Sequence, residues 1–311
     1  MRFSEMFIIT KAHRRPDLTL FTVLIMLAFC FLLAQKSAAR LTRDQSGRTV
    51  SVPDNPQRIV SLAPSITEIV FALGAGDRLK GVTQHCDFPA DAQFLPKVGS
   101  YVHLDLERIV ALKPDLCIAV RDGNPQNAVT ELEALGIPVY AVDPRNLDTA
   151  VDTVLEVGQL LNANTKAQDL ANEMRARIQR VKERVAKTGL RPRVFFQIGS
   201  APIVSAGTNT VIHELIVTAG GQNLADGPSS YPRFSREQVL ALQPEVIIIT
   251  SMTKESDLEQ VSAEWRHYEG LPAVRNNRIF IVDADLFDRP TPRIINGLET
   301  LAGIIHPESF R

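Results

Sequence analysis

A histidine and a cysteine stand side by side at His85 and Cys86. An imidazole nitrogen is a common metal ligand, so His85 can act as an axial ligand to a metal carried by a bound molecule. Cys86 is a softer candidate for the same role. A lone histidine is more often an ordinary loop or core residue, and that interpretation of His85 stays open. The histidines that follow along the chain show no metal-ligand spacing.

Aromatic and charged side chains elsewhere offer other contacts to a ligand. Tyr101 and Tyr231 each combine a flat apolar ring with a hydroxyl, and Phe287 adds a third ring. Such rings suit a macrocycle whose edge carries amides. Asp285 and Arg289 are expected to hydrogen-bond that edge, and a local ion pair between them is the alternative. The full predicted ligand-binding set is Ser65, His85, Tyr101, Arg121, Tyr231, Asp285, Phe287 and Arg289.

Two glutamates occupy the same place in a segment that occurs twice. The pattern E-x-x-x-A-L-x-P begins at Glu107 and again at Glu237. Asp105 and Ser235 precede them at positions typical of helix N-caps, so both carboxylates fall in a first helical turn. A first-turn carboxylate stabilises a helix by several tenths of a kcal/mol through the helix dipole, which is one sufficient explanation. The dipole does not explain why both glutamates recur at equivalent positions.

The elements that position these residues form two similar sets. In the first set, strands are predicted at 58–62, 81–83, 115–120 and 138–142, with helices at 67–73 and 106–112. In the second, strands are predicted at 193–198, 246–249 and 278–282, with helices at 211–218 and 236–242. This alternation predicts parallel sheets covered on both faces, in a duplicated α/β lobe. Ligands of such lobes collect beyond the carboxyl ends of the strands, where the predicted ligand-binding residues lie.

A long helix is predicted between the two sets. The apolar residues Leu170, Met174, Ile178, Val181 and Val185 fall on one stripe of a helix over 164–188. About 24 residues at 1.5 Å each make a rod of roughly 36 Å, which favours a small tilt between lobes over a wide closure. The predicted fold is two similar parallel-sheet (Rossmann-like) lobes joined by one long α-helix. The predicted divisions are a signal peptide at 1–39, an N-terminal α/β lobe at 40–163, the linking helix at 164–188 and a C-terminal α/β lobe at 189–311.

The first 39 residues have the pattern of a secretory signal. Basic residues precede an apolar run over 18–33, and Ser37 and Ala39 are the small residues of a cleavage site after Ala39. Retention of this segment as an uncleaved anchor is the alternative. Cys30 is not expected to carry a lipid, because the bulky Phe29 precedes it and further apolar residues follow. These features predict a periplasmic protein.

Composition excludes several classes of function. Without residues 1–39 the chain has 29 basic and 33 acidic residues, which changes its formal net charge from −1 to −4. A mildly acidic protein lacks the broad positive field that nucleic acid requires. Cys86 and Cys117, the two remaining cysteines, are too few to hold an iron–sulfur cluster, and we expect them on non-adjacent strands without a disulfide. No nucleophile elbow or phosphate-binding glycine loop is present, so an enzyme is not expected.

Several segments resemble a known family. The run Arg58–Glu68, R-I-V-S-L-A-P-S-I-T-E, resembles the opening of helical-backbone (class III) periplasmic solute-binding proteins. These proteins serve ABC importers of cobalamin, haem and ferric siderophores. Leu106–Leu116, Arg121–Asn124, Ser235–Ala241 and Asp285–Arg293 look most like the cobalamin-binding member. The resemblance covers essentially the whole chain after residue 39.

The resemblance implies a function. It implies a carrier with no cofactor of its own that captures cobalamin or a related corrinoid between two lobes and delivers it to an ABC importer, a permease dimer with ATPases. It also implies that Glu107 and Glu237 dock with arginines of the membrane subunits. Tyr101 and Tyr231 stand where the cobalamin binder often has tryptophan, and His85 where it has tyrosine. These departures also suit haem, so a haem or ferric-siderophore binder is the alternative, and a chelatase-like enzyme a remote one.

Overall fold

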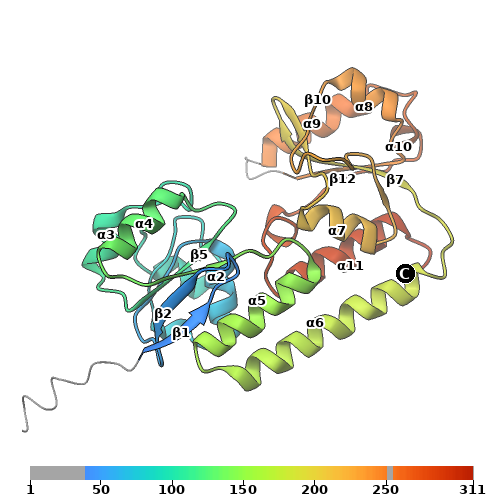
Figure 1. Ribbon diagram of the computed structural model, residues 1–311. Coiled ribbons are helices and arrows are strands. Elements are labelled where there is room, and N and C mark those ends of the chain that lie inside the picture. The colour runs from blue at the N-terminus through green and yellow to red at the C-terminus, as the bar shows by residue number, and fades with distance from the viewer. Residues whose placement is uncertain (1–38, 251–254, 311) are drawn as a thin grey trace, which may run out of the picture. The chain divides into compact units, whose positions relative to one another are not determined.

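The computed structural model describes residues 39–250 and 255–310. Residues from Ala39 onward form one compact unit that contains two main sheets, each with helices on its faces (Figure 1). The predicted signal segment and Cys30 lie outside the described residues. Within the described part of the chain, no helix is both long enough and apolar enough to cross a membrane.

The N-terminal sheet has four parallel strands in the order β4-β3-β5-β6. Its strands are β3 (Ile59–Ser61), β4 (Leu79–Gly81), β5 (Leu116–Val120) and β6 (Val139–Val142). Successive side chains point to opposite faces, so Cys117 and Ile118 of β5 enter two separate apolar clusters. The second strand ends earlier than its predicted range of 81–83, because Val82 forms only an isolated bridge with Lys97.

Short helices and one hairpin surround this sheet. The helical elements are α2 (Pro64–Ala72), η1 (Gly76–Arg78), η2 (Ala90–Phe94), α3 (Leu106–Ala111), α4 (Gln126–Ala134) and α5 (Leu147–Leu160). The hairpin pairs β1 (Ala39–Arg43) with β2 (Thr49–Pro53) in antiparallel register, and it was not predicted. α3 and α4 cover one face of the sheet through Ile109, Val129 and Leu132, while α2 and α5 pack on the other.

The C-terminal sheet has six strands and mixed direction. In the order β10-β8-β7-β11-β12, with β9 also paired to β7, the strands are β7 (Arg193–Ser200), β8 (Ile203–Ser205), β9 (Gln222–Asn223), β10 (Arg233–Phe234), β11 (Val246–Ile249) and β12 (Ile279–Ile281). β7, β11 and β12 are parallel, as predicted, whereas β8 pairs antiparallel with both β7 and β10. The helical elements are α7 (Val211–Thr218), α8 (Arg236–Leu242), α9 (Glu255–Arg266), α10 (Pro272–Arg275), η3 (Ala284–Leu286) and α11 (Ile294–Ile305).

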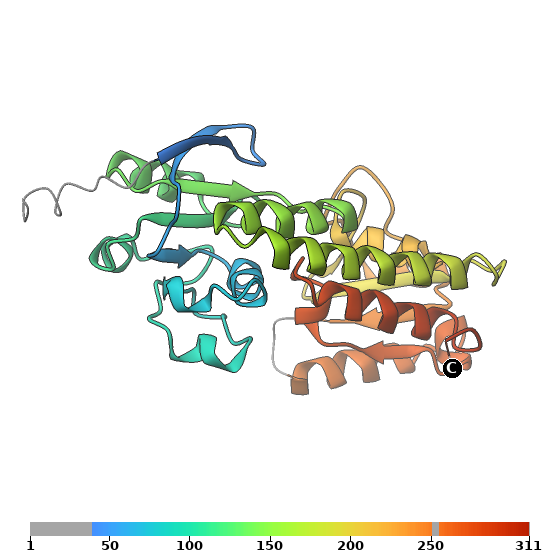
Figure 2. The same ribbon diagram turned by 90° about the horizontal axis from the view of Figure 1, so that it is seen from below.

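One long helix passes along both sheets. α6 (Asn164–Val185) packs against α5 at one end and against α7 and α11 at the other, and Figure 2 shows it lengthwise. Met174, Ile178 and Val181 of its predicted stripe are buried. A Cβ atom on Gly158 would lie 2.2 Å from the Cβ of Ala167, so a glycine is required where α5 and α6 approach each other. The predicted α/β fold with two lobes and a long connecting helix is confirmed.

Trp265 and Cys117 are both buried in the protein interior. Trp265 of α9 is only 2% exposed, and its indole Nε1 donates a hydrogen bond of 2.8 Å to Oε1 of Gln197 on β7. Cys117 lies inside β5, where burial raises the pKa of its thiol to about 12. β3 separates β4 from β5, and both Cys86 and Cys117 are free thiols.

Candidate ligand-binding site

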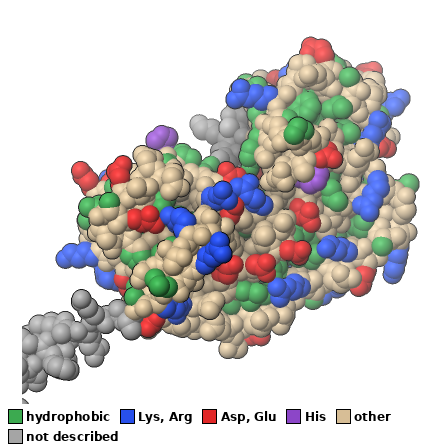
Figure 3. Space-filling model, viewed as in Figure 1, with side chains coloured by type: hydrophobic (Ala, Val, Ile, Leu, Met, Phe, Trp, Pro, Cys, Tyr) green, Lys and Arg blue, Asp and Glu red, His purple; other side chains and the backbone are tan. Residues whose placement is uncertain are grey.

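A cavity of about 590 Å³ lies at the carboxyl ends of the strands of both sheets. Segments that follow β3, β4, β5 and β6 form its wall on the N-terminal lobe. On the C-terminal lobe the wall consists of part of β7 and of segments that follow β8, β9 and β12. The lining residues are Ala63, Pro64, Ser65, His85, Tyr101, Val120, Asp122, Asp143, Pro144, Arg145, Ile198, Asn209, Thr210, Val211, Ile212, Tyr231, Ala284, Asp285, Asp288, Arg289 and Pro290. Charged side chains of both signs gather on the face between the two lobes (Figure 3).

Most of the residues predicted to bind ligand line this cavity. They are Ser65, His85, Tyr101, Tyr231, Asp285 and Arg289. Tyr101 comes from the N-terminal lobe and Tyr231 from the C-terminal lobe, so each lobe contributes one phenol ring. The Tyr231 side chain is partly open to solvent. Desolvation by the cavity wall, followed by the charges of Asp122 and Asp288, raises the pKa of its hydroxyl. Six of the eight predicted residues thus share one cavity.

Phe287 does not line the cavity, and the prediction of a third aromatic wall is wrong. Its side chain is fully buried, and its ring lies 5.5 Å from the ring of Phe196 on β7. The cause is the short η3 turn, in which the Phe287 amide donates to the Ala284 carbonyl at 3.0 Å. By packing in the core, the Phe287 ring anchors the loop that carries Asp285 and Arg289.

Arg121 also lies outside the lining residues. Its side chain is 56% exposed and its Nη1 lies 3.1 Å from Oδ2 of Asp143, the residue that follows β6. Arg145 contacts the same carboxylate at 3.0 Å. Asp143 therefore holds two guanidinium groups at the rim of the N-terminal lobe, a role that the sequence did not indicate.

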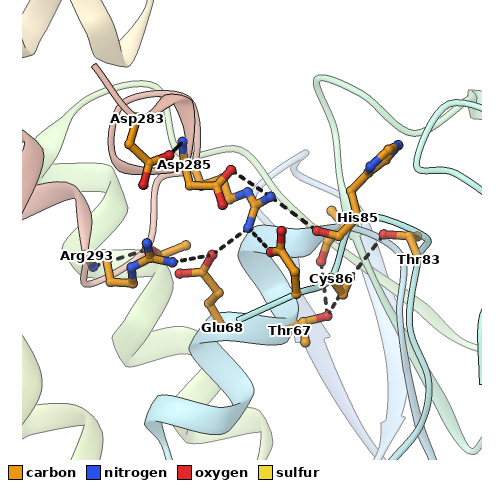
Figure 4. Close-up of polar contacts among 12 residues, drawn as sticks. Thr67, Glu68, Thr83, His85, Cys86, Asp283, Asp285 and Arg293 are labelled. Carbon is orange, nitrogen blue, oxygen red and sulfur yellow. Dashed lines mark hydrogen bonds and ion pairs between the residues drawn. The ribbon is translucent and has the colours of Figure 1, made fainter. Parts of the chain in front are cut away.

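A cluster of charged residues joins the two lobes beside the cavity (Figure 4). We call Glu68, Asp87, Asp285, Arg289 and Arg293 the interlobe ion-pair cluster. Arg289 lies 3.1 Å from Oε1 of Glu68, 2.8 Å from Oδ1 of Asp87 and 2.7 Å from Oδ1 of Asp285. Nη1 of Arg293 lies 3.4 Å from the same Glu68 oxygen. The contact between Asp285 and Arg289 is the local ion pair that stood as the alternative.

The electrostatics of this cluster are set by Glu68, which α2 places in the interior. Its side chain is 2% exposed, and burial raises the pKa of its carboxyl although Arg289 and Arg293 act in the opposite direction. Arg293 also stacks over the Phe88 ring, 4.0 Å from the ring centroid. Partial burial acts to raise the pKa of Asp87, but the hydrogen bond and charge of Arg289 outweigh it and lower that pKa.

His85 and Cys86 have opposite environments. His85 is exposed at the cavity, and its imidazole points away from the buried carboxylate of Glu68 (Figure 4). Cys86 is 2% exposed, and its Sγ atom lies 3.2 Å from both the Thr67 and Thr83 hydroxyls. The candidate role of Cys86 as a metal ligand is therefore wrong, because its thiol faces the core. Among the described residues, no group of three or more His, Cys, Asp or Glu side chains is arranged to hold a metal ion.

Glu107 and Glu237 lie outside the cavity at matching helix starts. Both are exposed, and Figure 1 shows α3 and α8 in different lobes on the side away from α6. Asp105 caps α3 by accepting from the Arg108 amide at 3.0 Å. Ser235 caps α8 in a reciprocal capping box with Gln238. The predicted caps are thus present.

Comparison with known proteins decides the family. Residues 59–286 match the family model described as periplasmic binding protein. This chain is a periplasmic binding protein. The class III assignment is confirmed, and the family is one of solute carriers rather than enzymes.

Relatives of this periplasmic binding protein include carriers of two kinds. The vitamin B12-binding protein of Yersinia pestis (strain Pestoides F) is 34% identical over 246 residues, which is 79% of this chain and 85% of that protein. The structure of the periplasmic vitamin B12 binding protein BtuF of Vibrio cholerae matches with a TM-score of 0.72 and 32% identity, over 81% of this chain and 98% of that one. The periplasmic heme-binding protein RhuT from Roseiflexus sp. RS-1 matches with a TM-score of 0.73 and 28% identity, over 81% and 99%.

Proposed function

We propose that this binding protein captures cobalamin, or a related corrinoid, in the cavity between its lobes and delivers it to an ABC importer. The observation that carries the proposal is that Tyr101 of the N-terminal lobe and Tyr231 of the C-terminal lobe line the same cavity, in a chain related to vitamin B12-binding proteins along both lobes. Two phenol rings offer apolar area to a macrocycle, and the aspartates around them accept hydrogen bonds from amides.

The cellular setting belongs to the same proposal. The protein works in the periplasm after cleavage of the signal at 1–39, and its partner is a permease dimer with ATPases. Its divisions are the N-terminal lobe at 40–163, the linking helix at 164–188 and the C-terminal lobe at 189–311. The position of α6, Asn164–Val185, supports this division. Along the chain, the strands of the N-terminal sheet precede this helix and those of the C-terminal sheet follow it.

A comparative titration tests the ligand. Purified protein lacking residues 1–39 is titrated separately with cyanocobalamin, cobinamide, haemin and a ferric siderophore, and heat and absorbance are recorded. We expect saturable heat with cyanocobalamin and none with the siderophore. No heat with cyanocobalamin, together with a Soret shift on addition of haemin, would overturn the corrinoid assignment.

Haem is the second candidate because His85 stands exposed at the cavity and RhuT is a heme-binding relative. If haem is the ligand, imidazole coordination through His85 gives a shifted Soret band, and His85→Ala removes that shift. His103→Ala is the matched control, since His103 is exposed on a loop and does not line the cavity. An equal Soret shift in wild type and His85→Ala rules out the histidine as the axial ligand.

Truncating the cavity tyrosines is expected to weaken binding. Tyr101→Ala and Tyr231→Ala should each lower the affinity for cyanocobalamin about 10- to 100-fold, because large rings in a binding pocket carry much of the binding energy. Tyr101→Phe and Tyr231→Phe keep the ring and should stay within about fivefold of wild type, which corresponds to loss of one neutral hydrogen bond. Calorimetric titration measures both pairs. Wild-type affinity in the alanine variants would exclude the tyrosines from the binding surface.

A further inference from the structure

The charged residues on the cavity wall are predominantly acidic. Four aspartates line it (Asp122, Asp143, Asp285 and Asp288), against the two arginines Arg145 and Arg289. Both guanidinium groups are already engaged. Arg145 lies 3.0 Å from Asp143, and Arg289 is shared among three carboxylates of the interlobe ion-pair cluster. Neither arginine is left to meet an anionic group of a ligand.

Two of the four aspartates have no such partner. Asp122 follows β5 on the N-terminal lobe and Asp288 follows η3 on the C-terminal lobe. Within the described part of the chain, neither carboxylate makes a hydrogen bond or an ion pair. Both aspartates line the cavity near Tyr231, and after the larger effect of burial their charges raise the pKa of its hydroxyl, while Arg145 acts in the opposite direction. Each lobe thus contributes one unpaired aspartate to the cavity wall near Tyr231.

A ligand edge meets these carboxylates in one of two ways. A primary amide donates its N–H groups, and a hydrogen bond to an ionised acceptor is about twice as strong as a neutral one. An ionised carboxylate on the ligand finds like charges instead, in a cleft from which the ligand itself displaces the screening water. The same two aspartates therefore favour one edge chemistry and oppose the other.

We propose that Asp122 and Asp288 make this cavity select macrocycles with an uncharged amide edge over macrocycles with ionised carboxylates. The inference deepens the proposed function, and it rests on that function in taking a macrocycle as the ligand. The two aspartates would thus let a single cavity distinguish ligands of similar size that differ in charge at their periphery.

Matched ligands that differ in charge at one position test the selectivity. Cyanocobalamin is compared with its derivative in which one peripheral amide is hydrolysed to the carboxylate, and haemin with its uncharged dimethyl ester. We expect wild type to prefer each uncharged form by about tenfold or more, because like charges are opposed at short range. In Asp122→Asn with Asp288→Asn the preference should fall to within about threefold. Asp91→Asn with Asp169→Asn removes the same charge from exposed positions outside the cavity and should keep the wild-type preference.

The pH dependence of the preference for uncharged ligands gives a second test, because protonation removes the charge of Asp288. Asp288 is exposed to solvent at the cavity, yet desolvation by the surrounding cleft, followed by the charges of Asp285 and Asp283, raises its pKa to about 7 against the opposing effect of Arg289. The carboxyl is ionised above that pKa, so the preference for uncharged ligands should increase from about pH 6 to about pH 8. The other titratable or charged residues at the cavity are His85, Tyr101, Asp122, Asp143, Arg145, Tyr231, Asp285 and Arg289. A pH dependence unchanged in Asp288→Asn assigns it to one of these and contradicts the inference.

The outcomes separate the two proposals. If cyanocobalamin gives no heat but the dimethyl ester binds more tightly than haemin, the corrinoid function is overturned and the charge selectivity stands. If cyanocobalamin binds but its carboxylate derivative binds equally well, the function stands and the selectivity is overturned. An unaltered preference in the double asparagine variant also overturns the selectivity, whichever macrocycle binds.

Discussion

Replacing Glu107 and Glu237 together with alanine is expected to abolish transport while ligand affinity stays within about threefold of wild type. The two carboxylates are exposed at the first turns of α3 and α8, one on each lobe, and neither lines the cavity. We propose that each lobe presents one of these carboxylates to one half of a twofold importer, so loss of both would remove both contacts. Accumulation of labelled cyanocobalamin in cells that carry the importer measures the first effect, and calorimetry the second.

The controls for this prediction separate docking from helix stability. Loss of a first-turn carboxylate costs each helix only about 0.3–1 kcal/mol, so the double variant should remain folded at ordinary temperature. Glu131→Ala with Glu259→Ala removes the same charge from exposed helical glutamates of the same two lobes and should leave uptake unchanged. Loss of ligand affinity in place of transport would show that the two glutamates are not docking residues.

Glu68→Ala is expected to lower the free energy of unfolding by about 3 kcal/mol. Removal of this buried side chain leaves a cavity and takes away the acceptor that Arg289 and Arg293 share. Glu68→Gln keeps the volume and one acceptor oxygen. It should stay within about 1 kcal/mol of wild type, because the burial cost of a charged carboxylate offsets much of its ion pairing. Urea denaturation followed by circular dichroism measures both variants.

The pH dependence of stability provides a further check on Glu68. Because burial raises its pKa, the folded protein holds the proton on Glu68 more firmly than the unfolded chain does. Its contribution to stability is therefore greatest below the usual glutamate range and falls as the pH rises through the raised pKa. Glu68→Gln should remove this component of the pH profile. Asp87→Ala is the matched control in the same cluster, and its half-exposed carboxylate should contribute no more than about 1 kcal/mol. A loss from Asp87→Ala equal to that from Glu68→Ala would contradict the central place of Glu68.

Elements with strong local signals were predictable from the sequence. Helices α7 and α8 have their predicted bounds, Val211–Thr218 and Arg236–Leu242, because Thr210 and Ser235 cap their first turns. β11, Val246–Ile249, is a continuous apolar run whose side chains are all buried. Its composition alone marks a strand between two covered faces. The β1–β2 hairpin, β8, β9 and β10 were not predicted, because none of these strands has a continuous apolar run like that of β11.

The loops that line the cavity were predictable from the sequence. Six of the eight predicted ligand-binding residues line the cavity, because the ends of parallel strands locate it. Phe287 was placed wrongly, since the η3 turn that directs its ring into the core has no periodic signal. The contacts of Glu68 with Arg289 and Arg293 were missed because more than 200 residues separate the partners. Asp122 and Asp288 could not be singled out from the sequence, because their lack of an ion pair depends on which other carboxylates Arg145 and Arg289 contact in the fold.

The single tryptophan of the chain has a consequence for optical studies of this protein. Trp265 is held rigidly in the C-terminal lobe by its bond to Gln197, and it does not line the cavity. Its fluorescence therefore comes from one buried emitter outside the cavity. Energy transfer to a bound corrin or haem chromophore quenches such an emitter without contact. A colourless competitor that displaces the chromophore restores the tryptophan fluorescence. Unfolding of the same lobe exposes the indole and shifts its emission to longer wavelength, so occupancy and integrity can be read separately from one native probe.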